Sequence, residues 1–163
     1  LLKKALDHII VNAIKFTPDG GKVILRSRPT LMDNHTPGVE LSIQDTGIGL
    51  DAEHHELVFE KFYQVGNVSI HSSGKTSFKG GGPGAGLAIV RGVARAHGGK
   101  VWVESKGHDE VNFPGCTFYL HLPINARRGL RHAFLISPQR SSPYNPIGAT
   151  HRRPFHAVRL EFR

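Results

Sequence analysis

Residues 39–44 alternate strictly between apolar and polar side chains, and this pattern constrains the fold more than any other. Such alternation predicts a β-strand with one face against a core and the other towards solvent. The next residue, Asp45, falls by parity on the apolar side, where a carboxylate is unusual. Asp45 could cap the turn that follows, or it could accept a hydrogen bond from an exocyclic amine held in a mostly apolar pocket.

Two segments have the residue spacing of amphipathic helices. Residues 1–16 repeat apolar side chains at the i, i+3, i+4, i+7 spacing of one buried face, and residues 84–97 do the same. A third, short helix is expected from Asp51, as its N-cap, to about Phe62.

The remaining apolar runs are short and bounded by turn residues, as in β-strands. We expect four strands, at residues 22–28, 39–44, 100–105 and 116–122. Polar or glycine-rich stretches at residues 29–38 and 64–83 are expected to be loops. This order of elements predicts an α/β (α+β) two-layer sandwich, in which a mixed, largely antiparallel sheet is covered on one face by helices.

The net charge of +8 is concentrated at the C-terminal end. Residues 1–124 hold 13 Lys and Arg against 12 Asp and Glu, whereas residues 125–163 hold 8 Arg and one acid, Glu161. We therefore expect a near-neutral domain at 1–124 and a basic extension at 125–163 that is disordered or weakly docked. A groove for phosphate backbones needs positive charge across the folded surface, so no nucleic-acid partner is expected.

Further features bear on location. No apolar run approaches the roughly 18 residues that a membrane-spanning helix needs, so no membrane contact by these residues is expected. A single cysteine, Cys116, excludes an internal disulfide and favours a reducing, cytoplasmic setting. Because Leu1 lies almost inside the first helical pattern, we expect a fragment of a longer protein, and the sequence leaves open whether that protein is membrane-anchored.

A second stripe on the first helix carries His8, Asn12, Lys15 and Phe16 at the i, i+4, i+7 and i+8 positions. An amide oxygen is a suitable hard ligand for Mg²⁺, and a lysine can meet a phosphate as a point charge. For these residues taken alone, a solvated helix face is the interpretation that we favour.

The run Gly82-Pro83-Gly84-Ala85-Gly86 leads directly into the second long helix. Glycines let a backbone approach a polyanion closely, and a helix N-terminus offers free N–H groups and the positive end of its dipole. The run lacks the Lys-Ser/Thr ending of a P-loop and does not follow a short strand, as a dinucleotide fingerprint does. By itself it fits either a phosphate-binding turn or a flexible linker.

Five segments occur in this order: DHIIVNAIKFTPDGGKV, IQDTGIGLD, VFEKFYQV, GGPGAGLAIVRGVARAHGGKVWVES and GCTFYLHLP. They resemble the N, G1, F and G2 boxes and the closing strand of the histidine-kinase catalytic domain. That domain is a branch of the ATPase group that includes gyrase-, Hsp90- and MutL-type proteins. The resemblance covers residues 1–124 almost continuously, and it implies the Bergerat-type ATP-binding fold of the group.

The resemblance implies a role for each matching residue. Asn12 matches a Mg²⁺-chelating asparagine, Lys15 a phosphate-contacting residue and Phe16 an aromatic against the nucleotide. Asp45 matches the aspartate that accepts a hydrogen bond from the adenine amino group. The other ATP-binding positions implied are Gly47, Ile48, Gly49, Phe62, Gly82, Gly84, Ala85, Gly86, Leu87 and Thr117.

Some of these positions have more particular roles in the family. Thr117 is expected to support the adenine site through water, and the glycines of the G2 box are expected to hinge a lid over the phosphates. Phe59 and Phe62, in the F box, are expected to pack the lid and a partner domain.

Two positions depart from the family pattern. His8 stands where Asn or Glu is usual, which makes it a candidate catalytic residue that could bind near Mg²⁺ or phosphate or assist a proton transfer. A tolerated substitution on the helix edge is the interpretation that we favour. Ala85 stands where a bulkier apolar residue is common, and we expect it to loosen the lid hinge slightly.

The resemblance implies an enzyme: the ATP- and Mg²⁺-binding catalytic domain of a two-component sensor histidine kinase. The γ-phosphate would pass to a histidine on a separate dimerisation domain, expected outside this fragment, and then to a response regulator receiver domain. The fragment alone is expected to bind ATP with little or no turnover. Two alternatives stay open, a related clamp-type ATPase and a nucleotide-binding interaction module without transfer activity.

Overall fold

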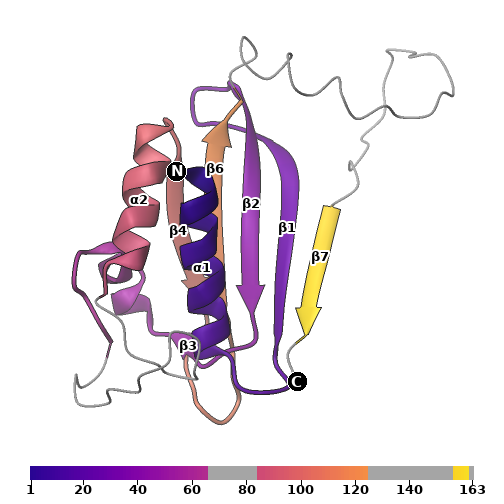
Figure 1. Cartoon of the computed structure of the whole chain (residues 1–163), viewed down its shortest axis with the longest axis vertical. Coiled ribbons are helices and arrows are strands. Elements are labelled where there is room, and N and C mark those ends of the chain that lie inside the picture. Colours follow the sequence, from indigo (N-terminus) through magenta and orange to yellow (C-terminus); the bar gives the residue numbers. More distant parts are fainter. Residues whose placement is uncertain (66–83, 125–155, 162–163) are drawn as a thin grey trace, which may run out of the picture.

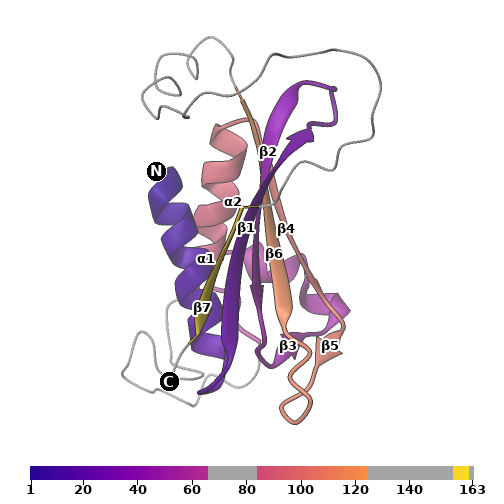
Figure 2. The same cartoon turned by 90° about the vertical axis from the view of Figure 1, so that its right-hand side faces the viewer.

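The computed structural model describes residues 1–65 and 84–124, together with the backbone of residues 156–161. These residues form two layers, a five-stranded sheet and a pair of helices that cover one of its faces (Figures 1 and 2). The helices, α1 (Leu2–Phe16) and α2 (Gly86–Ala96), lie side by side and run in opposite directions. The predicted two-layer sandwich is therefore confirmed.

The sheet has the strand order β4-β6-β2-β1-β7, and every pairing in the described residues is antiparallel. Its strands are β1 (Lys22–Leu31), β2 (Pro37–Asp45), β4 (Lys100–Ser105), β6 (Cys116–Pro123) and β7 (His156–Glu161). Two short strands, β3 (Gly49–Leu50) and β5 (Gly107–His108), pair with each other apart from the main sheet.

The core lies between the helices and the sheet. Ala5, Ile9 and Ala13 of α1 are at most 1% exposed and lie four residues apart, so they form one buried stripe. Alternate residues of the strands meet this stripe, among them Ile43 of β2 and Phe118 of β6, which are paired on neighbouring strands and share one face of the sheet. Burying a side chain of this size stabilises the fold by about 1.5–3 kcal/mol, so this stripe fixes α1 over the sheet.

The expected loop at residues 29–38 is shorter in the structure. Residues of β1 and β2 pair in register from Val23 with Asp45 to Leu31 with Pro37, which leaves only 32–36 as a turn. The prediction was wrong here because backbone pairing continues past the end of the apolar pattern.

The short helix expected from Asp51 to Phe62 is also wrong. Two separate 3₁₀ turns, Ala52–His54 and Leu57–Phe59, occupy this segment. Asp51 makes no side-chain cap, because its Oδ1 accepts a 2.8 Å hydrogen bond from the backbone N–H of His108. Phe59 is the one residue of these turns that is buried, so the segment has no continuous apolar face to hold a longer helix.

The basic extension lies mostly outside the described residues. Within it, β7 pairs antiparallel with β1, from Lys22 with Glu161 to Ser27 with His156. The C-terminal strand therefore covers an edge that β1 would otherwise leave open. The division of the chain at residue 124 stays a prediction.

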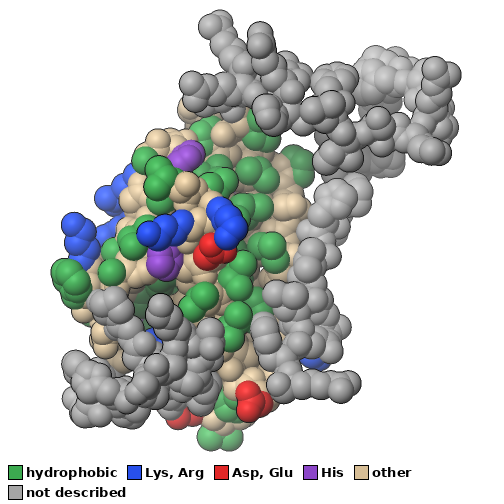
Figure 3. Space-filling model, viewed as in Figure 1, with side chains coloured by type: hydrophobic (Ala, Val, Ile, Leu, Met, Phe, Trp, Pro, Cys, Tyr) green, Lys and Arg blue, Asp and Glu red, His purple; other side chains and the backbone are tan. Residues whose placement is uncertain are grey.

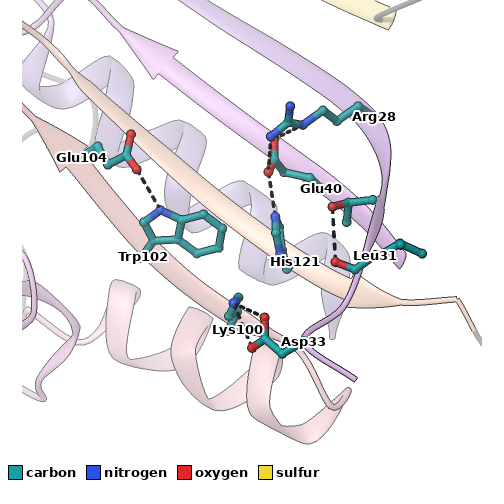
Figure 4. A network of polar contacts seen from close by, with 9 residues as sticks. Arg28, Leu31, Asp33, Glu40, Lys100, Trp102, Glu104 and His121 are labelled. Carbon is teal, nitrogen blue, oxygen red and sulfur yellow. Dashed lines mark hydrogen bonds and ion pairs between the residues drawn. The ribbon is translucent and has the colours of Figure 1, made fainter. Parts of the chain in front are cut away.

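The sheet face turned away from the helices carries a polar network (Figure 4). Glu40 accepts hydrogen bonds of 2.5 and 2.8 Å from Arg28 and one of 2.7 Å from His121. Beside them, the ring of Trp102 stacks on Tyr119 with 4.9 Å between the ring centroids. Glu40 is only 5% exposed, so its charge is balanced within this face.

The helix-covered side is shown space-filling in Figure 3. Lys and Arg side chains are scattered there among hydrophobic ones, over α1 and α2. Among the described residues, no helix is both long enough and apolar enough to cross a membrane.

Candidate functional site

Asp45 ends β2 on the helix-covered side of the sheet and is 5% exposed. Its Oδ1 accepts two backbone hydrogen bonds, from Gly47 at 2.9 Å and from Cys116 at 3.1 Å. The described residues place no hydrogen bond on Oδ2. The backbone therefore fixes one carboxylate oxygen and leaves the other to accept a donor from a ligand.

Burial raises the pKa of Asp45 from 3.8 to about 6, against the two backbone hydrogen bonds, which lower it. The ionised carboxylate is thus poorly solvated in this position. A donor brought by a ligand would replace hydration that the fold has already removed.

The turn after Asp45 is held against the end of α1. The backbone N–H of Ile48 donates a 3.1 Å hydrogen bond to the carbonyl oxygen of Phe16. A Cβ atom on Gly47 would lie 2.3 Å from that same oxygen, so only glycine fits at this approach. Gly49 has a φ of 73°, and a Cβ there would lie 2.0 Å from the carbonyl oxygen of Gly107. The predicted pocket-shaping residues 47–49 are therefore brought together with Phe16 and Asp45.

The second stripe of α1 lies half-buried rather than fully solvated. His8, Asn12, Lys15 and Phe16 are all partly covered, and the Nζ of Lys15 lies 4.8 Å from the centroid of the Phe16 ring. Burial lowers the pKa of Lys15 from its ordinary value. The stripe thus offers a cation and an amide at the end of α1 that meets the Asp45 turn.

The start of α2 faces the same stripe. A Cβ on Gly86 would lie 3.2 Å from Nδ1 of His8, so glycine lets the two helices approach. The N-cap residue of α2, Ala85, makes no side-chain cap, and in the described structure the buried Nε2 of His8 has no hydrogen-bond partner. Free N–H groups at a helix start form a place where an anion would be stabilised, and His8 lies beside this place.

The sequence predicted that the second long helix starts at Gly84, but in the structure Gly84 lies two residues before α2. Its φ of 65° is incompatible with a right-handed helix, so α2 begins at Gly86. Leu87 packs against the core from the first turn of α2. Gly82 and the expected lid lie outside the described residues.

Phe62 is on the surface, with 73% of its side chain exposed, whereas Phe59 is 1% exposed and packs edge-on against Phe118. The two F-box aromatics therefore differ: Phe59 is part of the core, and Phe62 is available for contacts outside it.

Thr117 is not beside Asp45. It pairs with Gln44 of β2 and Glu104 of β4, so its side chain lies on the opposite face of the sheet from Asp45. This prediction followed the family motif and ignored the alternation along β6, where Phe118 faces the core.

Cys116 is the residue of β6 that faces the Asp45 side. Burial, and then the nearby charge of Asp45, raise the pKa of its thiol to about 12, while a hydrogen bond with Ser105 acts the other way. The sequence contained the signal, because Cys116 shares its parity with Phe118 and Leu120.

Comparison with known proteins agrees with this arrangement. The family described as histidine kinase-, DNA gyrase B- and HSP90-like ATPase matches residues 1–126. Hybrid signal transduction histidine kinase D of Dictyostelium discoideum is 33% identical over 123 residues, which are 76% of this chain and 7% of that protein. Sensor histidine kinase WalK of Bacillus subtilis (strain 168) is 35% identical over 122 residues, 75% of this chain and 18% of that protein.

Solved structures are similar in the same region. The mycobacterial sensor histidine kinase MprB superimposes with a TM-score of 0.56 at 31% identity, over 74% of this chain and 68% of that one. Full-length ShkA in complex with AMPPNP gives a TM-score of 0.53 at 30% identity, over 75% of this chain and 21% of that one. The chain spans only part of its curated relatives. It covers 7% of the length of the Dictyostelium kinase and 30% of that of the sensory kinase SasA of Prochlorococcus marinus (strain MIT 9313).

Proposed function

Because the chain belongs to the family of histidine kinase-, DNA gyrase B- and HSP90-like ATPases, we propose that it is the nucleotide-holding catalytic domain of a two-component sensor histidine kinase. The observation that carries the proposal is the carboxylate of Asp45. Its Oδ1 is held by two backbone N–H groups, and its Oδ2 has no hydrogen bond from the described residues. An adenine amino group is a donor that this oxygen would accept.

The triphosphate would lie between α1 and the start of α2. Lys15 supplies a positive charge there, and the uncapped start of α2 supplies backbone N–H groups. The buried, unpaired Nε2 of His8 supports a role towards a phosphate or a water bound to it. His8 would then help to orient the reacting group from its position beside Gly86 at the start of α2.

Mg²⁺ fits the residues present at this place. Asn12 offers one hard amide oxygen on the half-buried stripe of α1, and Mg²⁺ in proteins commonly combines one or two protein ligands with phosphate oxygens and waters. When bound, the ion would neutralise phosphate charge during transfer. Asn12 would hold the ion on the same stripe of α1 that carries Lys15, which lies one turn further along the helix.

The contribution of the protein to transfer would be positioning and charge neutralisation, because phosphoryl transfer needs little covalent help. The acceptor would be a histidine on a separate dimerisation domain, and a response regulator receiver domain would take the phosphoryl group next. Leu57, Phe62 and Ile89 are 42%, 73% and 37% exposed, and they offer apolar contacts to such a partner beside the start of α2. We further propose that this activity takes place in the cytoplasm.

The experiment that tests this function measures where the phosphoryl group goes. The full-length protein is incubated with Mg²⁺ and ATP labelled at the γ-phosphate, and the products are tested for an acid-labile, alkali-stable phosphohistidine. We expect phosphohistidine in the wild type and none in Asn12→Ala. Release of phosphate without phosphohistidine would indicate a clamp-type ATPase, and nucleotide binding without either would indicate a binding module; both outcomes would contradict the kinase.

A further inference from the structure

Ser105 is the last residue of β4, at the point where three turns of the chain meet. The turns are the one after Asp45, the one that leads into β5 and the one that precedes β6. Ser105 is half-buried and belongs to none of the positions discussed above as binding a nucleotide.

Its hydroxyl joins all three turns. The backbone N–H of Leu50 donates to Oγ at 3.0 Å, and Oγ donates to the carbonyl oxygen of Gly115 at 2.7 Å. A second carbonyl, that of Gly107, lies 3.2 Å from the same Oγ. A hydroxyl has one proton, so the shorter contact to Gly115 takes it and Gly107 is the alternative acceptor.

Gly115 connects Ser105 to Asp45 through hydrogen bonds of its own backbone and of the next residue. Its N–H donates to the carbonyl oxygen of Gly47 at 2.9 Å, and the next residue, Cys116, donates its N–H to Oδ1 of Asp45 at 3.1 Å. The approach is close: a Cβ on Gly115 would lie 2.1 Å from the carbonyl oxygen of Asp45. A small displacement of Gly115 therefore alters the donor that holds Asp45.

We propose that Ser105 is a positioning residue for Asp45. The hydroxyl of Ser105 holds Gly115 so that the N–H groups of Gly47 and Cys116 both donate to Oδ1 of Asp45. Oδ2 then keeps one direction, towards a ligand donor. The nucleotide consequence rests on the proposed function, in which that donor is the adenine amino group. Without the hydroxyl, Leu50 and Gly115 lose a shared partner, and the two donors on Asp45 lose their common alignment.

The first readout needs no nucleotide. Carboxyl NMR titration of this 163-residue chain should show a higher pKa for Asp45 in Ser105→Ala than in the wild type, because a weakened Cys116 hydrogen bond stabilises the carboxylate less. Amide exchange at Cys116 should become faster in the same variant. Ser105→Thr keeps the hydroxyl and should restore both values. If Ser105→Ala leaves both unchanged, the positioning role is wrong.

The second readout uses two nucleotides that differ at one group. The affinities of a non-hydrolysable ATP analogue and of its inosine counterpart, which lacks the amino group, are compared by calorimetry. Ser105→Ala should reduce the preference for the adenine compound at least about fivefold, which is roughly 1 kcal/mol, the net worth of one hydrogen bond. Equal weakening of both compounds would mean a general structural role and would overturn the proposal.

Two controls separate the possible failures. Thr30→Ala removes a hydroxyl at the far end of β1, whose one hydrogen bond in the described residues goes to the carbonyl of Leu31 at 3.5 Å, and should change neither readout. In an Asp45→Asn background, adding Ser105→Ala should leave the adenine preference unchanged. If the wild type shows no adenine preference while the pKa of Asp45 still responds to Ser105, the proposed nucleotide function fails and the positioning role stands.

Discussion

The backbone N–H of Phe62 donates a 3.1 Å hydrogen bond to the carbonyl oxygen of Gly84, and both residues have left-handed backbones, with φ of 64° and 65°. This contact joins the F box to Gly84, two residues before α2 begins. It therefore helps to fix where α2 starts, beside His8.

Gly84→Ala should destabilise the protein. An alanine with positive φ costs about 1–2 kcal/mol, and its Cβ would lie 2.8 Å from the carbonyl oxygen of Tyr63. Urea unfolding should show a loss of at least about 1 kcal/mol. Phe62→Gly is the matched control: Phe62 is 73% exposed and glycine accepts the same φ, so this variant should lose no stability. An unchanged free energy of unfolding in Gly84→Ala would contradict the left-handed backbone of Gly84.

Asp45 makes stability depend on pH in a direction that the raised pKa dictates. The folded protein binds this proton more tightly than the unfolded chain, so the stabilisation is complete below the ordinary value of 3.8 and is lost as pH rises through about 6. Asp45→Asn cannot ionise and should be more stable than the wild type at pH 7, by up to about 3 kcal/mol.

The measurement is the difference in unfolding free energy between wild type and Asp45→Asn at pH 4 and at pH 7. The gain should shrink towards pH 4, where the wild-type carboxyl is mostly protonated. A gain that is the same at both values would contradict the assignment of the raised pKa to Asp45.

Much of this site could be predicted from residue patterns, and the predictions that were wrong have physical causes. Parity along β2 placed Asp45 on the core side correctly, because the side chains of a strand must alternate. The same rule applied to β6 selects Cys116, whereas the family motif selected Thr117. Alternation is imposed by backbone geometry and holds for each chain, but a match to a family motif can be wrong by one residue in a short strand.

Other features could not be read from the sequence. Ser105 acts through contacts with Leu50 and Gly115, which lie 55 and 10 residues away along the chain. No local pattern encodes such contacts, because they exist only after the three turns have been brought together. The pairing of β7 with β1 across more than a hundred residues is hidden for the same reason.

Glu40→Gln should destabilise the face of the sheet opposite the helices. Burial alone raises the pKa of Glu40, but the hydrogen bonds from Arg28 and His121 outweigh it and keep the pKa below its ordinary value. The carboxylate thus stabilises the fold above pH about 4.5, and this contribution is lost as pH falls through the folded pKa. We expect a loss of about 1–3 kcal/mol at pH 7 in urea unfolding.

The control for Glu40 is Asp33→Asn. Asp33 pairs with Lys100 at 2.8 Å, but its side chain is 84% exposed, so the pair is screened by water and should contribute little. Equal effects of the two substitutions would show that burial does not strengthen the contacts of Glu40.

Removal of residues 125–163 should expose the edge of β1 that β7 covers. An open edge strand lowers stability and favours self-association, so the unfolding temperature should fall and the apparent mass by light scattering should rise with concentration. A chain that ends at Glu161 keeps β7 and should behave as the wild type does. An unchanged unfolding temperature in the shorter chain would contradict the pairing of β7 with β1.

The central claim is that Asp45 holds an adenine nucleotide, and calorimetric titration of the chain with Mg²⁺ and a non-hydrolysable ATP analogue tests it most directly. We expect saturable binding of one analogue per chain, and binding at least about tenfold weaker in Asp45→Asn, a loss of roughly 1.4 kcal/mol. Because Asp45→Asn should be the more stable protein at pH 7, weaker binding could not be ascribed to unfolding. Comparable affinities of the two proteins, or no binding by either, would contradict the assignment of Asp45 to the nucleotide.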